Sequence, residues 1–300
     1  MSRALRSAEV SFAPALSRRP RPGGVPLVLL AIGSLQFGAA LAGTVFDQAG
    51  PAGTALLRSV FAAILMWLIA RPRIRAHAPR HLRLAAVFGL LLGFMNLCIY
   101  ESFARIGLGI AVTIEFAGPL AVAVALSRKR TDLAAAATAA VGIVLLADPA
   151  GGSVDVVGVL LALAAAACWA AYILVAQVAG KVFAGNEGLA LAMPFSVLVP
   201  LVPGLAGDGG DLLSLEVLGV GAAVALLSSV LPYSLETEAL RHVPAHVFGV
   251  LMSLEPAVAA LAGFLVLGEG LRVRDVVAIV LVMAASVVVT RSVPPAAEVG

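Results

Sequence analysis

The chain has 300 residues, of which 61% are hydrophobic and only 12% are charged, and its mean hydropathy is +1.05. These values lie far outside the range of soluble globular domains and exclude that class. The net charge of +3 and the pI of about 9.2 reflect basic loops beside anionic lipid, so we do not expect a nucleic-acid partner.

Ten long apolar stretches follow one another along the chain. Each is long enough to cross a ~30 Å hydrocarbon core as a helix, and their continuous apolar character excludes a barrel, whose strands would alternate. In chain order we expect spans at 25–46, 52–70, 84–103, 108–126, 133–147, 156–176, 188–205, 217–235, 245–267 and 273–290. The sequence therefore predicts an all-α integral membrane protein with ten transmembrane helices.

Two short segments flank these spans. Residues 1–24 are rich in Arg, Pro and Ser and are expected to form a disordered tail. They are not a secretory signal, because the apolar stretch that follows is too long and lacks a convincing cleavage site. Residues 291–300 form a second, shorter tail.

Lysine and arginine are distributed unevenly over the connections. With the N-terminus inside, the outer connections hold only Arg105, Arg272 and Arg274 of the 20 basic residues, and Arg58 lies within the second span. Because cytoplasmic connections carry the excess of basic residues, both termini are predicted to be cytoplasmic.

The two halves of the chain repeat a pattern. Aligning Pro119 with Pro256 pairs Glu101 with Glu238, and each half then has a glutamate just before a mid-span proline. Because a five-helix unit is odd, its second copy enters the membrane from the opposite face. Inverted repeats are common in secondary transporters, with the substrate site near the midplane. The two predicted repeats are residues 25–147 and 156–290.

Several strings within these repeats carry a family resemblance. They are "LLR" at 56–58, "GIAVTIEFAGPLAVA" at 109–123, "ACWAAYIL" at 167–174, "LPYSLE" at 231–236 and "MSLEPAVAAL" at 252–261. The chain resembles the EamA-type branch of the drug/metabolite transporter superfamily, most closely the threonine/homoserine exporter type of bacterial inner membranes.

This resemblance implies export of small amino acids or related metabolites. Together with the inverted repeats it predicts a secondary transporter that works by alternating access, and we expect protons to be the coupling ion because of Glu255, which is described below. An alternative on the same fold is efflux of amphipathic cationic drugs. The chain has no GxSxG, HExxH or phosphate-cradling loop, so we expect neither an enzyme nor a cofactor. Substrate identity and oligomeric state do not follow from the sequence.

Arg58 and Glu115 are charged residues at a similar depth, ~10 Å below the outer surface at 1.5 Å per residue. A charge at bilayer depth costs at least ~2.5 kcal/mol, so each should face a cavity or a partner. Two interpretations stay open. The residues form a structural ion pair, or Arg58 receives a substrate carboxylate while Glu115 takes the ammonium or a proton.

Glu255 is the deepest carboxyl, ~15 Å inside the ninth span and near the midplane. No basic residue is obviously placed to neutralise it, and desolvation favours its protonated form. We expect it to bind and release a proton near neutral pH, as proton coupling requires. The alternative is a permanently protonated acid that donates to a backbone carbonyl.

The mid-span prolines each leave a carbonyl without its helical donor. Pro119 frees the carbonyl of Glu115 and Pro256 that of Met252. These groups could coordinate an ammonium or a water, or they could mark simple kinks.

Aromatic and polar residues complete the candidate site. Trp169 and Tyr172 share a face of the sixth span and are expected to line a central cavity. Weaker candidates for the cavity wall are Tyr100, Gln36 and Phe37. Candidates for an inner gate, or else for a solvated rim, are Tyr233, Glu236 and Glu238.

Other features are interpreted as structural. Cys98 and Cys168 lie in apolar spans and are expected to be packing residues. The i,i+4 histidine pairs, His77 with His81 and His242 with His246, lack a further ligand in helical register, so no metal site is predicted. Gly89 and Gly93 form a small-xxx-small pair that suits close helix packing.

Overall fold

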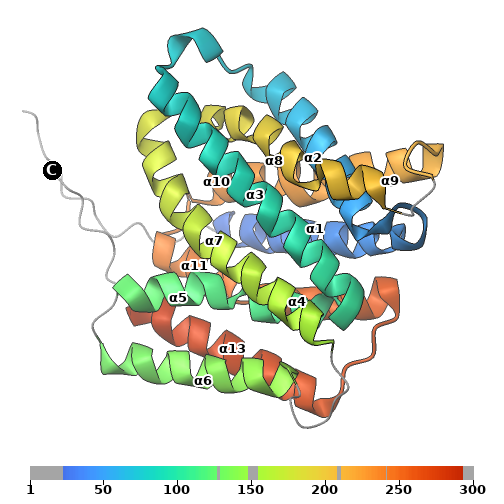
Figure 1. Ribbon diagram of the computed structural model, residues 1–300. Helices are drawn as coiled ribbons and strands as arrows, with labels where there is room; N and C mark the ends of the chain where they lie inside the picture. Colours follow the sequence, from blue (N-terminus) through green and yellow to red (C-terminus); the bar gives the residue numbers. More distant parts are fainter. Residues whose placement is uncertain (1–22, 127–128, 148–154, 208–210, 241, 293–300) are drawn as a thin grey trace, which may run out of the picture.

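The computed structural model describes residues 23–126, 129–147, 155–207, 211–240 and 242–292, which form a bundle of helices (Figure 1). The predicted tails lie almost wholly outside this part of the chain. The helices are α1 Gly24–Gly43, α2 Phe46–Ala70, η1 Ile74–Ala76, α3 Pro79–Ile106, α4 Leu108–Glu115, α5 Ala117–Leu126, α6 Arg130–Ala147, α7 Val156–Val182, α8 Glu187–Ala206, α9 Leu215–Ala225, η2 Leu226–Val230, α10 Leu231–Ala239, α11 Ala245–Met252, α12 Glu255–Ala262, η3 Gly263–Leu267 and α13 Val273–Ser292.

Within the described ranges, ten helical segments are long and apolar enough to cross a membrane, and they coincide with the ten predicted spans. The predicted all-α class is confirmed. The second helix begins earlier than expected, at Phe46, because it continues across a kink at Gly50, whose φ is 65°, and Pro51. The third begins at Pro79, because proline suits the first position of a helix.

The fourth and ninth spans are each broken near their proline. α4 ends at Glu115, four residues before Pro119, and α11 ends at Met252, four residues before Pro256. Proline cannot donate the backbone hydrogen bond that would join the two parts of each span. Each span therefore presents helix ends within the bundle.

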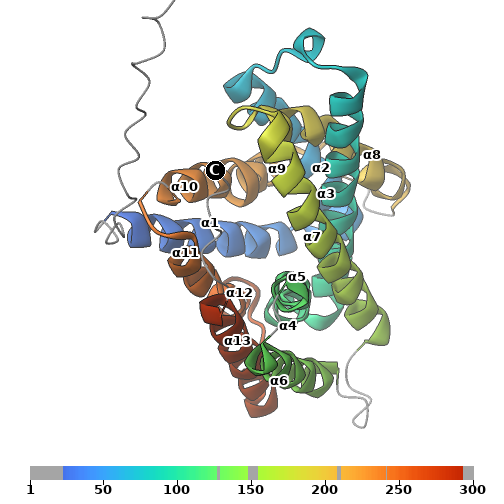
Figure 2. The same cartoon turned by 90° about the vertical axis from the view of Figure 1, so that its left-hand side faces the viewer.

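Packing in one half has a counterpart in the other. α3 packs against α7 and α8, while α9, η2 and α10 pack against α1 and α2. α6 packs along α13, and Figures 1 and 2 show this pair as a layer at one side of the bundle. If each span of one half is replaced by the corresponding span of the other half, these contacts are unchanged. This is the pattern expected of the predicted inverted repeats.

Gly89 and Gly93 bring α3 against α8, in agreement with the packing interpretation. A Cβ on Gly89 would collide with the carbonyl oxygen of Ala192. We expect Gly89→Ala to destabilise the protein by about 1–3 kcal/mol, the usual cost of overpacking, seen as a lower unfolding temperature in detergent. Gly180→Ala is the matched control, because a Cβ there meets open space. Equal unfolding temperatures for the two variants would contradict this account of the helix contact.

Candidate functional site

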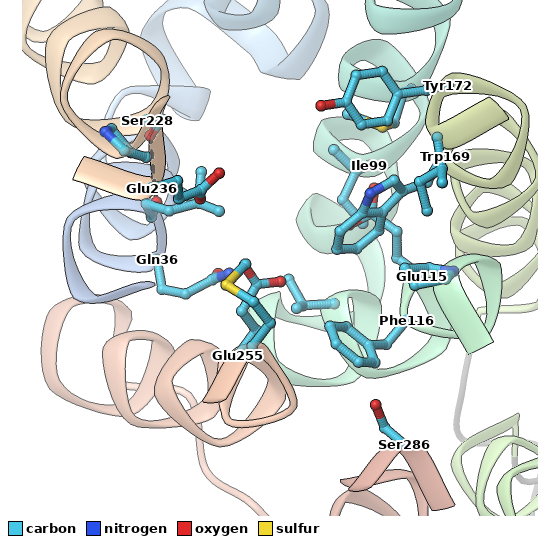
Figure 3. Close-up of a pocket in the computed structure, with 18 of the residues that line it drawn as sticks. Gln36, Ile99, Glu115, Phe116, Trp169, Tyr172, Ser228, Glu236, Glu255 and Ser286 are labelled. Carbon is cyan, nitrogen blue, oxygen red and sulfur yellow. Dashed lines mark hydrogen bonds between the residues drawn. The ribbon is translucent and has the colours of Figure 1, made fainter. Parts of the chain in front are cut away.

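A cavity of about 340 Å³ lies inside the bundle and is lined by residues of both halves (Figure 3). Most of its wall is apolar, so the polar groups that face it are few and specific. They are Gln36, Arg58, Asn96, Tyr100, Glu115, Trp169, Tyr172, Ser228, Tyr233, Glu236, Glu255, Ser286 and Thr290.

The structure brings most of the predicted site residues to this cavity, including both deep carboxyls and Pro119. Pro256 and Glu238 are not among its lining residues. Glu238 instead contacts Nε2 of His242, at 2.9 Å on the last turn of α10. The inclusion of Phe37 was wrong, because its side chain is 37% exposed on the outside of α1. Successive residues of a helix point ~100° apart, and Gln36 takes the inward position.

The sequence analysis missed four polar lining residues. Asn96, Ser228, Ser286 and Thr290 are small or neutral, so they lack the energetic cost that singles out a charge in lipid. Each is nevertheless a polar residue inside an apolar span, and that weaker signal was available.

Arg58 is the basic residue of the cavity wall and is itself buried, at 7% exposure. Its guanidinium donates to the carbonyl oxygen of Ser228 at 3.0 Å, to the Tyr100 hydroxyl at 3.4 Å and to Oγ of Ser229 at 3.4 Å. It also lies 5.5 Å from the centre of the Tyr100 ring. Arg58 belongs to the first half and both serines to the second, so this one side chain links the halves.

Pro232 explains why a serine carbonyl accepts from Arg58. Proline has no N–H, so the carbonyl of Ser228, four residues earlier, lacks its helical donor. Among the described residues, Arg58 forms no ion pair with Glu115. The structural ion pair considered above is therefore not present in this conformation, and Glu115 remains available to another partner.

Glu115 and Glu255 approach the cavity from opposite walls (Figure 3). Glu115 is the last residue of α4 and is 7% exposed, while Glu255 opens α12 and is 1% exposed. Oε1 of Glu255 is buried and has no hydrogen-bond partner in the part of the chain that the structure describes. Figure 3 shows the amide of Gln36 reaching toward this carboxyl from α1.

Trp169 and Tyr172 form an aromatic wall on α7. The indole of Trp169 meets Phe116 edge to face, with ring centroids 5.6 Å apart, and Tyr172 stacks on Phe88 at 5.4 Å. Both contacts hold the rings in place. These contacts orient both side chains, and Trp169 and Tyr172 both line the cavity.

The two broken spans pack on each other at one end of the bundle and not at the other. α4 packs along α12, but α5 and α11, their continuations, do not pack closely on each other within the described residues. Lining residues accordingly continue past the helix breaks to Ala123 on α5 and Phe248 on α11. The closed end is the one at which α4 begins.

Known proteins resemble this chain in sequence and in fold. A model of the EamA-like transporter family matches residues 156–291. The chain is 39% identical to the Threonine/homoserine exporter RhtA of Salmonella typhimurium (strain SL1344) and 40% identical to that of Escherichia coli (strain K12), with 90% of this chain and 92% of each relative aligned. An uncharacterized transporter of Clostridium kluyveri is 25% identical over 49% of this chain and 50% of its own length.

A crystal structure of a further protein has a similar fold. Its TM-score is 0.61 at 17% sequence identity, and the match covers 89% of this chain and 96% of that chain. At this identity the likeness concerns the fold alone.

Proposed function

The chain belongs to the EamA-like transporter family, and on that premise we propose that it exports small amino acids of the threonine and homoserine type across a bacterial inner membrane. The single observation that carries the proposal is the cavity inside the bundle, which Arg58, Glu115 and Glu255 line together. The sequence relatives named as exporters of these compounds support the choice of substrate.

The charges of the cavity suit a zwitterion. An amino acid carries one carboxylate and one ammonium, and burying either without a partner is costly. We assign the substrate carboxylate to Arg58 and the ammonium to Glu115. The carbonyl of Glu115, freed by Pro119, is a further acceptor for the ammonium.

This assignment leaves Glu255 for the coupling proton. Burial favours its protonated form, whereas its place in the first turn of α12 favours the carboxylate, because helix N-termini attract negative charge. Opposing effects of this kind allow a group to gain and lose a proton during a cycle. The unpartnered Oε1 supports this role.

Alternating access fits the two-half architecture. In the proposed cycle, the contact between α4 and α12 opens while α5 and α11 close, so that the cavity changes the side to which it opens. The exchangeable packing of the two halves supports this motion.

Orientation follows from the basic residues, and we expect both termini in the cytoplasm. Alkaline phosphatase fused after Arg291 should be inactive, whereas the same reporter placed in the 208–216 connection should be active. The reverse pattern of activities would contradict the proposed orientation.

The substrate class is tested in growing cells. We expect overproduction to raise tolerance to toxic analogues of threonine and homoserine and to leave tolerance to dyes and quaternary ammonium compounds unchanged. A cationic drug site favours aromatic groups around its carboxylates, and Trp169 and Tyr172 keep this second candidate open. Resistance to the dyes without resistance to the amino-acid analogues would establish drug efflux instead.

A further inference from the structure

Glu269 makes a contact across the two halves that none of the proposed roles uses. It lies in the turn between η3 and α13, after the ninth span. Both of its carboxyl oxygens accept from the backbone N–H of Leu108, each at 2.9 Å, and 161 residues separate the two partners.

The N-terminus of α4 needs this partner. The first N–H groups of a helix have no acceptor within the helix, and the N-cap residue of α4 is Gly107, which has no side chain to supply one. A carboxylate is the strongest acceptor for such donors, and it is further stabilised by the helix dipole. The second half therefore supplies the cap that α4 lacks.

Two glycines make room for the carboxyl group of Glu269. A Cβ on Gly107 would lie 3.1 Å from Oε2 of Glu269, and a Cβ on Gly263 would collide with the same oxygen. Gly107 also has a φ of 84°, a conformation that other residues rarely adopt. A glycine in each half therefore leaves the space that the Glu269 side chain occupies.

The contact lies at the closed end of the cavity. At the residue that follows Leu108, α4 and α12 pack so tightly that a Cβ on Gly109 would lie 2.7 Å from Cα of Ala260. Leu108 itself lines the end of the cavity. The bond joins α4 to the turn that follows α12 and η3, so a separation of α4 from this turn breaks it.

We propose that Glu269 keeps the cavity closed at the end where α4 begins, and we call this contact the latch. Its carboxyl group holds the N-terminus of α4 against the η3–α13 turn and releases it whenever that end opens. This inference rests on the alternating-access cycle of the proposed function. Glu269 binds no substrate in this role and acts only on the balance between closed and open states.

The test is a distance measurement across this end of the bundle. Nitroxide labels at Ala104→Cys on α3 and Leu265→Cys on η3, both exposed positions, are read by double electron–electron resonance in a background with Cys98→Ser and Cys168→Ser. Removing the charge with Glu269→Gln should raise the ratio of long to short distances about tenfold or more, as expected for the loss of a charge-assisted hydrogen bond. Asp211→Asn, at an exposed carboxyl of the same end, should leave the ratio unchanged.

A second pair of variants covers the case in which Glu269→Gln does not fold. Gly263→Ala should displace the carboxyl group and shift the ratio in the same direction, whereas Gly219→Ala, whose Cβ meets open space on α9, should not. An unchanged distance distribution in a folded Glu269→Gln or Gly263→Ala protein overturns the latch.

This outcome is separable from the proposed function because the distances need no substrate. A wild-type protein that transports threonine while both variants keep the wild-type distances would refute the latch alone. Shifted distances in a protein that transports no amino acid would refute the proposed function and keep the latch.

Discussion

Glu255→Gln should abolish threonine export driven by a proton gradient and leave threonine exchange across the membrane intact. The amide is an uncharged mimic of the protonated acid, so the variant can still complete the substrate-loaded half of the cycle but cannot release a proton. Because a neutral amide costs less in lipid than a carboxylate, folding should be preserved. Exchange is measured as counterflow of labelled threonine, and coupling as accumulation under an imposed pH difference.

Glu115→Gln is the matched comparison, since it removes the other deep carboxyl of the same cavity. We assign Glu115 to the substrate ammonium, so this variant should weaken counterflow and driven export together. Asp211→Asn, at an exposed carboxyl outside the cavity, should affect neither. If Glu255→Gln still drives accumulation at the normal rate, Glu255 is only a buried hydrogen-bonding group and the coupling assignment fails.

Arg58→Lys should lower threonine export about tenfold or more even though the charge is kept. The guanidinium reaches Tyr100, Ser228 and Ser229 at once through a planar fork of donors. A lysine ammonium is a compact charge on a flexible stem and cannot hold these three acceptors together while it meets a carboxylate. The loss of hydrogen bonds to a charged group sets the expected size of the effect.

Two measurements separate binding from folding in this variant. The yield of monodisperse protein in detergent should stay near that of the wild type, because Lys keeps a buried charge and one hydrogen bond. The KM for threonine should rise, since Arg58 is assigned to the substrate carboxylate. A wild-type KM in the Arg58→Lys protein would show that Arg58 links the halves and does not bind substrate.

The sequence predicted the helices well, because their signal is strong and local. Continuous apolar runs define all ten spans, and a proline marks the break in the fourth and in the ninth. Charged residues at bilayer depth also indicated Arg58, Glu115 and Glu255 as cavity residues, since lipid leaves such groups few other places.

Contacts that depend on how the helices pack could not be read from the sequence. The acceptor for Arg58 is the carbonyl of Ser228. Pro232 marks this carbonyl as lacking its helical donor, but the sequence does not show that Arg58 of the other half lies against it. Glu269 lies in a connection where a carboxyl is ordinarily solvated, and its partner is a backbone N–H in the other half. Phe37 was placed wrongly because the rotation of α1 about its axis is fixed by its neighbours and not by its own sequence.

The most direct test of the central claim is transport by the purified protein in liposomes. Threonine should accumulate against its gradient when a pH difference is imposed, and this accumulation should be lost when a protonophore removes the pH difference. Labelled threonine should also enter preloaded vesicles by counterflow. Liposomes with the Glu255→Gln protein should show the counterflow alone. Threonine movement no faster than in protein-free liposomes, in both assays, would contradict the assignment of this cavity to amino-acid export.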